Sequence, residues 1–455
     1  MAATHYDNLI IGFGKGGKTL TTKLASEGEQ VALVERSRAM YGGTCINIGC
    51  LPSKSLIIDA QSAHRAGEPG TGSFARAMAQ KTALTDALRA ANYNKVASLD
   101  SATVIDGTAQ FAGPHSVRVT AENGDEQIIE ADRIFINTGA SPRIPDITGL
   151  RTTPGVYDST GMLSLPELPQ RVVIIGAGFI GLEFASMLAD FGSEVTVLQR
   201  SGRFLAQEDE DVAQAIRDVL EQQGVRLVLN AVTTEVAIGT DSAVTVRAEV
   251  DGEPADFAAD AVLVAAGRTP NTADLNLQAA GVETDARGAI VVDEQLRTTA
   301  PNIWALGDVN GGPQHTYISL DDYRVVWSQL SERAKPYSRA DRRNVPSCVF
   351  LHVPYARIGI NEREAVERDL DVRVRVMPTA AVPKARVIRE TEGLLKAVTD
   401  AETGEILGVM LLCPEAYEMI NVVKVAMDMG AHAEELRDAI FTHPTMTEAL
   451  NDLFA

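Results

Sequence analysis

The sequence predicts an α/β protein with two βαβ units and a C-terminal α+β region. Three observations lead to this fold class. An apolar strand, a glycine-rich turn, a helix and a second strand follow one another at about 8–35, and the same order returns at about 172–198. From about 345 onward the pattern changes to strand-like runs such as Gly393–Val398 and an apolar helix around 420–429. A chain of 455 residues is also long enough for about three domains.

The first glycine-rich turn has the GxGxxG spacing, with Gly12, Gly14 and Gly17. Such a turn lets the backbone approach a pyrophosphate, to which the following helix N-terminus presents N–H donors. Glu35 stands at the end of the second strand, where a carboxylate accepts hydrogen bonds from both ribose hydroxyls. This unit is therefore predicted to hold FAD or NAD and to reject a 2′-phosphate.

The second turn repeats the spacing with Gly176, Gly178 and Gly181. Gln199 lies 23 residues after Gly176, just as Glu35 lies 23 residues after Gly12. Gln199 therefore occupies the position that the acid has in the first unit. Arg200 and Arg203 follow, and a guanidinium can bind a phosphate in a bidentate manner. NADPH is the donor expected here, with NADH as the alternative if both arginines are solvated surface charges.

Composition and charge exclude several function classes. A formal charge of −20 disfavours nucleic acid and anionic lipid, so neither nucleic acid nor membrane is an expected partner. No apolar run reaches the roughly 18 residues of a membrane span. The residues before the first strand lack the features of a signal peptide, which predicts a cytoplasmic protein.

Four cysteines are too few for a secreted disulfide framework, and Cys348 and Cys413 are expected to be small buried residues. Cys45 and Cys50 lie five apart, which on a regular helix means about 7.5 Å of rise and no disulfide. A bond between them needs a distorted turn, which Gly49 permits. Taken alone, the spacing is more typical of two unrelated thiols, but the position just after Glu35 favours a redox pair.

With these motifs, the chain resembles the pyridine nucleotide-disulfide oxidoreductase family, which includes glutathione reductase, dihydrolipoamide dehydrogenase and mercuric reductase, over essentially its whole length. The resemblance implies two Rossmann-like FAD/NAD(P)-binding domains plus a C-terminal α+β dimerisation domain, and an FAD-containing homodimer reduced by NADPH or NADH. We expect an FAD domain at 1–150 and 268–343, an NAD(P)H domain at 151–267, and a dimerisation domain at 344–455.

The resemblance also assigns roles. Cys45 would be the thiol that meets the substrate and Cys50 the thiol that contacts the flavin. Lys54 would lie near flavin N5 and pair with Glu183, and Phe179 would gate the nicotinamide pocket. The remaining residues expected to contact FAD or the nicotinamide nucleotide are Gly43, Thr44, Ala109, Thr138, Gly139, Ile180, Gly267 and Asp308.

Near the C-terminus, His443 and Glu448 resemble the acid-base pair that the family supplies from the partner subunit. A histidine can take the proton of a thiol, and a carboxylate can stabilise the imidazolium. Thr445 and Glu448 also have the spacing of a capping box, which is a purely structural alternative. The Gly-, Ala- and Ser-rich stretch at about 65–80 predicts a loop. The apolar helix at 420–429 predicts burial on two sides, either in a domain core or at a subunit interface.

The electron acceptor is expected to be a small molecule or a metal ion, with no resident metal site. A narrower resemblance, carried by Met40–Cys50, Tyr317–Arg324 and Phe441–Pro444, is to a family member associated with copper(II) reduction and reactive-chlorine resistance. Mercuric reductases carry a further cysteine pair at the C-terminus, whereas residues 450–455 contain none. The alternatives are a small-disulfide reductase, a dihydrolipoamide dehydrogenase, or a flavin-bound redox sensor.

Overall fold

The computed structural model describes residues 3–239 and 243–455. The chain divides into two compact units. Unit 1 consists of Met1–Ser55, Met78–Arg143 and Gly267–Arg342, and unit 2 of Leu56–Ala77, Ile144–Ala266 and Arg343–Ala455. Within the described ranges, no helix is both long enough and apolar enough to cross a membrane.

Unit 1 is built on a sheet with the order β3-β2-β1-β6-β5-β4, in which β17 also pairs with β6. β1, β2, β3, β6 and β17 pair in parallel, and β4 and β5 extend the sheet in antiparallel fashion. Its strands are β1 (Thr4–Ile11), β2 (Val31–Glu35), β3 (Ala102–Asp106), β4 (Thr108–Gly113), β5 (Ser116–Thr120), β6 (Glu126–Ile136) and β17 (Ile303–Ala305). A separate pair joins β7 (Ala140–Pro142) to β16 (Arg268–Pro270).

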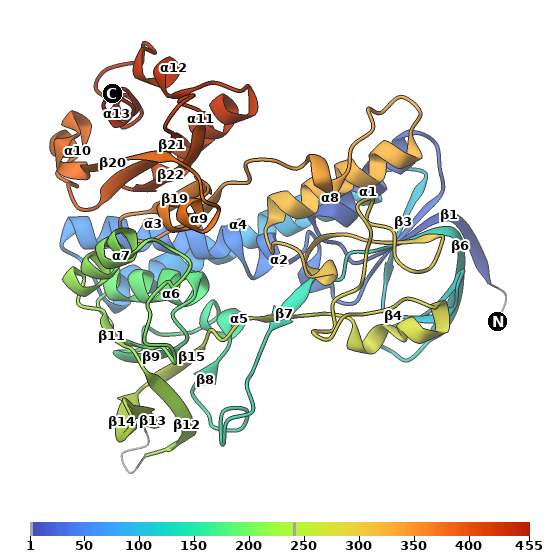
Figure 1. The fold of residues 1–455 in the computed structure, drawn as a ribbon. Coiled ribbons are helices and arrows are strands. Elements are labelled where there is room, and N and C mark those ends of the chain that lie inside the picture. The colour runs from blue at the N-terminus through green and yellow to red at the C-terminus, as the bar shows by residue number, and fades with distance from the viewer. Residues whose placement is uncertain (1–2, 240–242) are drawn as a thin grey trace. The chain divides into compact units, whose positions relative to one another are not determined.

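Helices α1 (Lys15–Ser26) and α8 (Thr316–Leu330) lie side by side on this sheet (Figure 1). Successive side chains of β1 point to opposite faces of the sheet and so enter two different apolar cores. Leu9 and Ile11 belong to one core, and Ile10 belongs to the core that includes the apolar face of α1. Burial on both faces explains why β2 reads as an unbroken apolar run ending at Glu35. The redox segment adds α2 (Thr44–Asn47) and α3 (Cys50–Ala66).

Unit 2 contains a second parallel sheet, with the order β11-β10-β9-β15-β8. Its strands are β8 (Val156–Tyr157), β9 (Arg171–Ile175), β10 (Glu194–Leu198), β11 (Arg226–Val228) and β15 (Ala261–Val264). An antiparallel sheet comprises β12 (Ala231–Ile238), β13 (Val244–Val250) and β14 (Glu253–Ala259). The helices of this region are α5 (Ser159–Met162), α6 (Phe179–Asp190) and α7 (Glu210–Gln222).

The C-terminal part of unit 2 is an antiparallel sheet with the order β18-β19-β22-β21-β20. Its strands are β18 (Ser347–Val349), β19 (Tyr355–Gly359), β20 (Val372–Pro378), β21 (Leu394–Asp400) and β22 (Ile406–Leu412). Helices α9 (Glu362–Glu367), α10 (Pro383–Ile388), α11 (Ala416–Asp428), α12 (Ala433–Arg437) and α13 (Ala449–Leu453) accompany it. The α/β class and the α+β C-terminal region are as the sequence predicts, whereas the predicted domain limits stay a prediction.

One local expectation is wrong. The stretch at 65–80 is mostly helical, because α3 continues to Ala66 and α4 (Thr71–Ala97) begins five residues later. Its alanines favour helix, and the connecting glycines occupy only the short turn between the two helices. The apolar helix around 420–429 is buried on one side in the single chain, since Val423 is fully buried while Val425 is 59% and Met429 82% exposed. Burial of its other side against a partner subunit stays a prediction.

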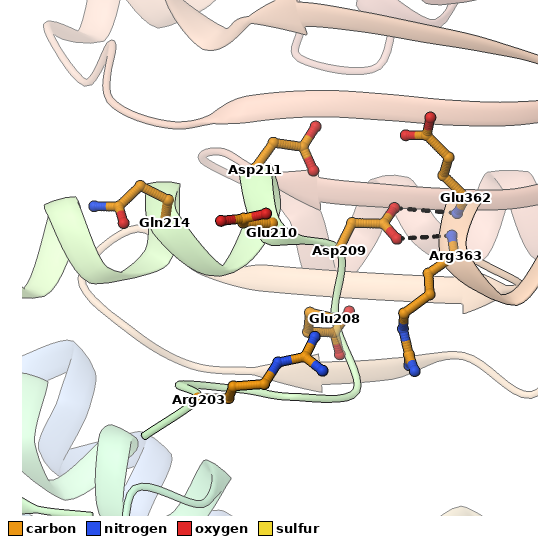
Figure 2. A pocket seen from close by; sticks show the side chains of 8 residues that line it. All are labelled: Arg203, Glu208, Asp209, Glu210, Asp211, Gln214, Glu362 and Arg363. Atoms are coloured by element: carbon orange, nitrogen blue, oxygen red, sulfur yellow. Dashed lines mark hydrogen bonds between the residues drawn. The ribbon is translucent and has the colours of Figure 1, made fainter. Parts of the chain in front are cut away.

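Unit 2 also contains a recess of about 650 Å³ lined mainly by charged side chains (Figure 2). Asp209, the residue before α7, accepts hydrogen bonds from the backbone N–H groups of Glu362 and Arg363 at 3.1 and 3.0 Å. The ammonium of Lys396, on β21, lies 2.8–3.0 Å from carboxylate oxygens of Asp209, Asp211 and Glu362. Lys396 is 1% exposed, so this lysine joins α7, α9 and β21 from inside the protein.

Candidate active site

The segment that carries Cys45 and Cys50 begins with two glycines in a conformation that other residues rarely adopt. Gly42 and Gly43 have φ angles of 94° and 83°. A Cβ on Gly43 would lie 2.7 Å from the Cα of Gly14, so only glycine lets this segment approach the first glycine-rich turn. The cysteine segment is therefore packed directly onto the turn predicted to bind pyrophosphate.

The helix is interrupted between the two cysteines, as the sequence predicts. α2 ends at Asn47, Ile48 leaves the helical conformation, and α3 begins at Cys50. A Cβ on Gly49 would lie 2.9 Å from the carbonyl oxygen of Thr44, so glycine permits the turn to close. This interruption brings together two thiols that a continuous helix would hold apart.

Both cysteines are free thiols, with Cys45 half-buried and Cys50 exposed. The hydrogen bond between them raises the pKa of Cys45, and burial and the charge of Cys50 raise it further. The Thr316 hydroxyl and the Lys18 ammonium act in the opposite direction. Thr316 Oγ1 also lies 3.6 Å from Cys50 Sγ. The reduced pair thus keeps a proton on Cys45 when Cys50 is ionised.

Asn47 supports this segment and was not identified from the sequence. Its side-chain amide donates to the carbonyl oxygens of Tyr41 and Gly43 at 3.0 and 2.9 Å and accepts from Arg89 Nε at 2.9 Å. The Tyr41 ring stacks on Tyr93, with centroids 4.8 Å apart. The only available signal was a polar residue between two isoleucines inside the motif.

The first glycine-rich turn has the features predicted for a dinucleotide site. Glu35 is 8% exposed, and one of its carboxylate oxygens accepts from the N–H of Phe13 at 3.0 Å. Burial raises the pKa of Glu35, although backbone N–H donors oppose this effect. Gly14, which precedes α1, has no side chain to cap the helix, and the N–H groups of Gly16 and Gly17 donate to Ser319 Oγ at 3.1 Å and Asn137 Oδ1 at 2.9 Å.

A second residue missed by sequence reasoning, Asn137, holds this turn in place. Its side chain accepts from the N–H of Gly17 at 2.9 Å and donates to the carbonyl oxygen of Leu306 at 2.7 Å. It is 6% exposed and stands at the end of β6, one residue before Thr138. A polar residue directly after an apolar strand was the signal that could have found it.

The backbone beside Asp308 is held in place by a different buried acid, Asp322. Asp322 is 1% exposed and accepts from the N–H of Gly307 at 2.7 Å and from Arg342 at 2.6 Å. Asp308 itself is half-buried, and burial raises the pKa of its carboxyl while the charge of Arg268 lowers it.

Two stretches far apart in sequence are joined by hydrogen bonds between Thr138 or Gly139 and Asn271. The side-chain amide of Asn271 donates to the carbonyl oxygen of Thr138, and the Thr138 hydroxyl donates to that of Asn271, both at 2.8 Å. The backbone N–H of Asn271 donates to Gly139 at 2.9 Å. Ala109 is buried on β4, within the core of the same sheet.

The second glycine-rich turn reproduces the first in detail. Gln199 Oε1 accepts from the N–H of Ala177 at 3.2 Å, the same bond that Glu35 makes with Phe13. A Cβ on Gly176 would lie 2.6 Å from the carbonyl oxygen of Ala265, while Gly178 has open space around it. At the start of α6, Phe179 is half-buried and Ile180 is 38% exposed. Arg200 and Arg203 are both exposed, which suits either a phosphate contact or plain solvation.

Glu183 lies on α6, and one of its carboxylate oxygens accepts from the backbone N–H of Phe350 at 3.0 Å. Lys54 lies on α3 in unit 1. The pairing of Lys54 with Glu183 stays a prediction.

The C-terminal pair has the contacts of a capping box and also places His443 against Glu448, while its acid-base role stays a prediction. His443 Nδ1 lies 2.8 Å from one carboxylate oxygen of Glu448, and the other oxygen accepts from the N–H of Thr445 at 3.2 Å. The Thr445 hydroxyl in turn accepts from the N–H of Glu448 at 3.3 Å. The His443 side chain is 70% exposed, so Glu448 is held by the cap and orients an imidazole that faces solvent in the single chain.

In the described ranges 3–239 and 243–455, no group of three or more His, Cys, Asp or Glu side chains is placed to hold a metal ion.

A family model described as pyridine nucleotide-disulphide oxidoreductase matches residues 6–322, and the dimerisation-domain model of the same family matches residues 345–454. The chain therefore belongs to this family, whose members are oxidoreductases that use FAD and NAD(P)H. The resemblance inferred from the motifs is confirmed.

Individual members of this family are similar to the chain over most of its length. The probable pyridine nucleotide-disulfide oxidoreductase RclA of Escherichia coli (strain K12) is 49% identical over 450 residues, which cover 99% of each chain. A mercuric reductase of Staphylococcus aureus is 34% identical over 461 residues, covering 98% of this chain and 81% of the relative. A Cu(II) complex of the HOCl-induced flavoprotein disulfide reductase RclA from Escherichia coli superposes with a TM-score of 0.94 at 49% identity, covering 100% of this chain and 99% of the other.

The residues of the first turn fit FAD on structural grounds. Gly12, with φ 106°, leaves no room for a Cβ, which would lie 2.4 Å from the Asn137 carbonyl oxygen. The N-terminus of α1 suits a pyrophosphate, and the buried Glu35 suits a ribose.

Proposed function

We propose that this protein is an FAD-dependent NAD(P)H oxidoreductase whose Cys45 and Cys50 cycle between disulfide and dithiol, and that its acceptor is an oxidised metal ion such as copper(II). The observation that carries the proposal is the interrupted helix, which holds the two thiols in hydrogen-bonding contact. This contact lies directly beside the turn predicted to bind FAD, because Gly43 packs against Gly14.

The proposed cycle balances two electrons at a time. FAD bound at Gly12, Gly14, Gly17 and Glu35 would supply the relay that takes a hydride from NAD(P)H and passes the electron pair to sulfur. The Cys45–Cys50 bond breaks on accepting two electrons and two protons, which gives the dithiol. Two copper(II) ions then each take one electron, which yields two copper(I) ions, restores the disulfide and releases two protons.

His443 and Glu448 would manage the proton of Cys45 from the partner subunit of a homodimer. The dimerisation-domain match supports a dimer. The imidazole is oriented by Glu448 and exposed, so its Nε2 is available to a group outside the single chain. The carboxylate favours the imidazolium that forms when the histidine takes a proton from a thiol.

The metal-ion acceptor rests on the relatives. RclA, which is 49% identical, has been solved as a Cu(II) complex, and the mercuric reductase relative is named for a metal ion as its acceptor. The same relatives lead us to propose a role in resistance to oxidative or reactive chlorine stress, in the cytoplasm where NAD(P)H is produced.

Turnover of the purified holoenzyme with NADPH and NADH tests the proposal. We expect copper(II) reduction, followed with a copper(I) chelator, to exceed the reduction of glutathione disulfide and lipoamide, and to fall to background in a Cys45→Ser variant. If lipoamide or glutathione disulfide is reduced at a much higher kcat/KM than copper(II), the acceptor assignment is wrong while the redox pair stands. A protein that purifies without flavin would contradict the whole proposal.

A further inference from the structure

Lys18 occupies an unusual place for a charged side chain. It follows Gly17 in the first turns of α1 and is half-buried. Its ammonium donates to the carbonyl oxygen of Gly42 at 3.1 Å and to Asn92 Oδ1 at 2.6 Å. The FAD-binding pattern assigns no role to this position, so the reason for a lysine here has to come from its surroundings.

The Gly42 contact ties Lys18 to the redox segment. Gly42 lies three residues before Cys45, in the pair of positive-φ glycines from which α2 starts. Asn92 lies on α4, so the lysine links α1, the redox segment and α4. A neutral donor would suffice to make these two hydrogen bonds, whereas lysine also brings a full positive charge.

That charge is not neutralised by an ion pair. Both acceptors are uncharged, and no carboxylate in the described part of the chain forms a salt bridge with Lys18. Burial, together with the charges of Lys15 on α1 and Lys95 on α4, lowers the pKa of Lys18 to about 8, although the charge of Cys45 acts to raise it. A charge kept in place against burial and two other cations needs a compensating function.

The charge acts on the thiol. The Lys18 ammonium lowers the pKa of Cys45, opposing the hydrogen bond, the burial and the Cys50 charge that raise it. We infer that Lys18 is a positioning residue of the redox pair: it holds the Gly42–Cys45 segment and keeps a positive charge beside Cys45 that favours its thiolate. This inference rests on the proposed redox role of the pair, and it assigns Lys18 to the step in which Cys45 meets the acceptor.

A thiol-alkylation assay tests this inference without requiring turnover. In a Cys50→Ser background, Cys45 is the only thiol of the pair, and its reaction with iodoacetamide can be followed by mass spectrometry from pH 6 to 9.5. Because only the thiolate reacts, a raised pKa appears as a slower rate at fixed pH. We expect Lys18→Met to alkylate roughly three- to tenfold more slowly at pH 7, which corresponds to a shift of about 0.5 to 1 pH unit.

Three further variants separate charge from structure. Lys18→Arg retains the charge and is expected to keep most of the rate. Asn92→Asp leaves Lys18 intact but places a carboxylate at the position that now lies 2.6 Å from its ammonium, and it should slow alkylation in the same direction as Lys18→Met. Lys95→Met removes an exposed cation that lowers the pKa of Lys18, so it retains the Lys18 charge and should not slow alkylation. Flavin content and the melting temperature check the fold of each variant.

The inference is overturned if the pH profile of Lys18→Met in this background matches that of the parent, or if Lys18→Arg is as slow as Lys18→Met. It is equally overturned if Asn92→Asp accelerates the reaction. None of these outcomes depends on electron transfer, so a failure here is distinct from a failure of the proposed function. The latter would appear as an absence of NAD(P)H-dependent reduction of the cysteine pair in the parent enzyme.

Discussion

Replacing Lys396 by methionine probes the interior ion-pair cluster of unit 2. Methionine retains most of the buried aliphatic stem but removes the ammonium that contacts Asp209, Asp211 and Glu362. Removing one partner of a buried pair typically costs about 3–5 kcal/mol because it leaves an uncompensated charge.

The cost here should be smaller than that range. The side chain of Asp209 is 7% exposed, but those of Asp211 and Glu362 are 41% and 49% exposed and can be solvated once the lysine is gone. Asp209 also keeps its hydrogen bonds from the N–H groups of Glu362 and Arg363. We therefore expect a loss of about 2 kcal/mol, which corresponds to a fall in melting temperature of about 5 °C for a unit of this size.

Differential scanning calorimetry of the holoenzyme measures this change, with Lys424→Met as the matched control. Lys424 forms an exposed pair with Asp428 one helical turn away, and its loss should cost under about 0.5 kcal/mol. A Lys396→Met variant that melts within 1 °C of the parent, or no lower than Lys424→Met, would refute the reasoning.

The loss of stability caused by Lys396→Met should also depend on pH, and its direction follows from the pKa shifts of Lys396 and Asp209. Burial acts to lower the pKa of Lys396, but the hydrogen bonds that its ammonium donates to Glu362, Asp209 and Asp211 prevail and raise it. Its stabilisation therefore persists below the ordinary lysine pKa and is lost only at higher pH. Burial acts to raise the pKa of Asp209, but its hydrogen bonds prevail and lower it, so its stabilisation is present above about pH 4 and lost as the pH falls. The difference between parent and Lys396→Met should be flat from pH 5 to 9 and shrink below pH 4.

Three further predictions concern the candidate active site. Thr316→Val removes a hydroxyl that lowers the pKa of Cys45, and a lost hydrogen bond of about 1 kcal/mol should slow its alkylation at pH 7 by roughly fivefold; an unchanged rate would show that the hydroxyl is irrelevant. Glu448→Gln removes the charge that stabilises an imidazolium at His443 and should lower kcat by about tenfold or more with a small change in melting temperature, whereas an unaltered kcat would leave Glu448 with a capping role alone. Arg200→Ala should raise KM for NADPH by about tenfold and leave KM for NADH unchanged, and equal effects on the two donors would exclude a 2′-phosphate contact.

The two nucleotide-binding units were predictable because their signals are local. The spacing of the glycines sets a turn in which a Cβ would collide with neighbouring backbone. The residue at the end of the second strand then contacts that turn. Glu35 and Gln199 have equal spacing from their first glycines, and each accepts a hydrogen bond from the second residue of its turn.

The supporting residues were not predictable because their partners are distant in sequence. Asn137 contacts residues 120 and 169 positions away, and Asn92 meets Lys18 across 74 positions. Nothing in the local pattern distinguishes such an asparagine from one that simply ends a strand or faces solvent. Helix α11 shows a related limit, since its second apolar face is exposed in the single chain and composition alone does not say what covers it.

The central claim is that Cys45 and Cys50 store an electron pair in addition to the one held by the flavin. Anaerobic titration of the oxidised holoenzyme with NADPH or NADH, followed by flavin absorbance and by mass-spectrometric counting of alkylated thiols, tests it most directly. The account predicts that the parent takes up four electrons per flavin and exposes both thiols, whereas Cys45→Ser takes up two. A parent enzyme that takes up only two electrons while both thiols remain unmodified would contradict it.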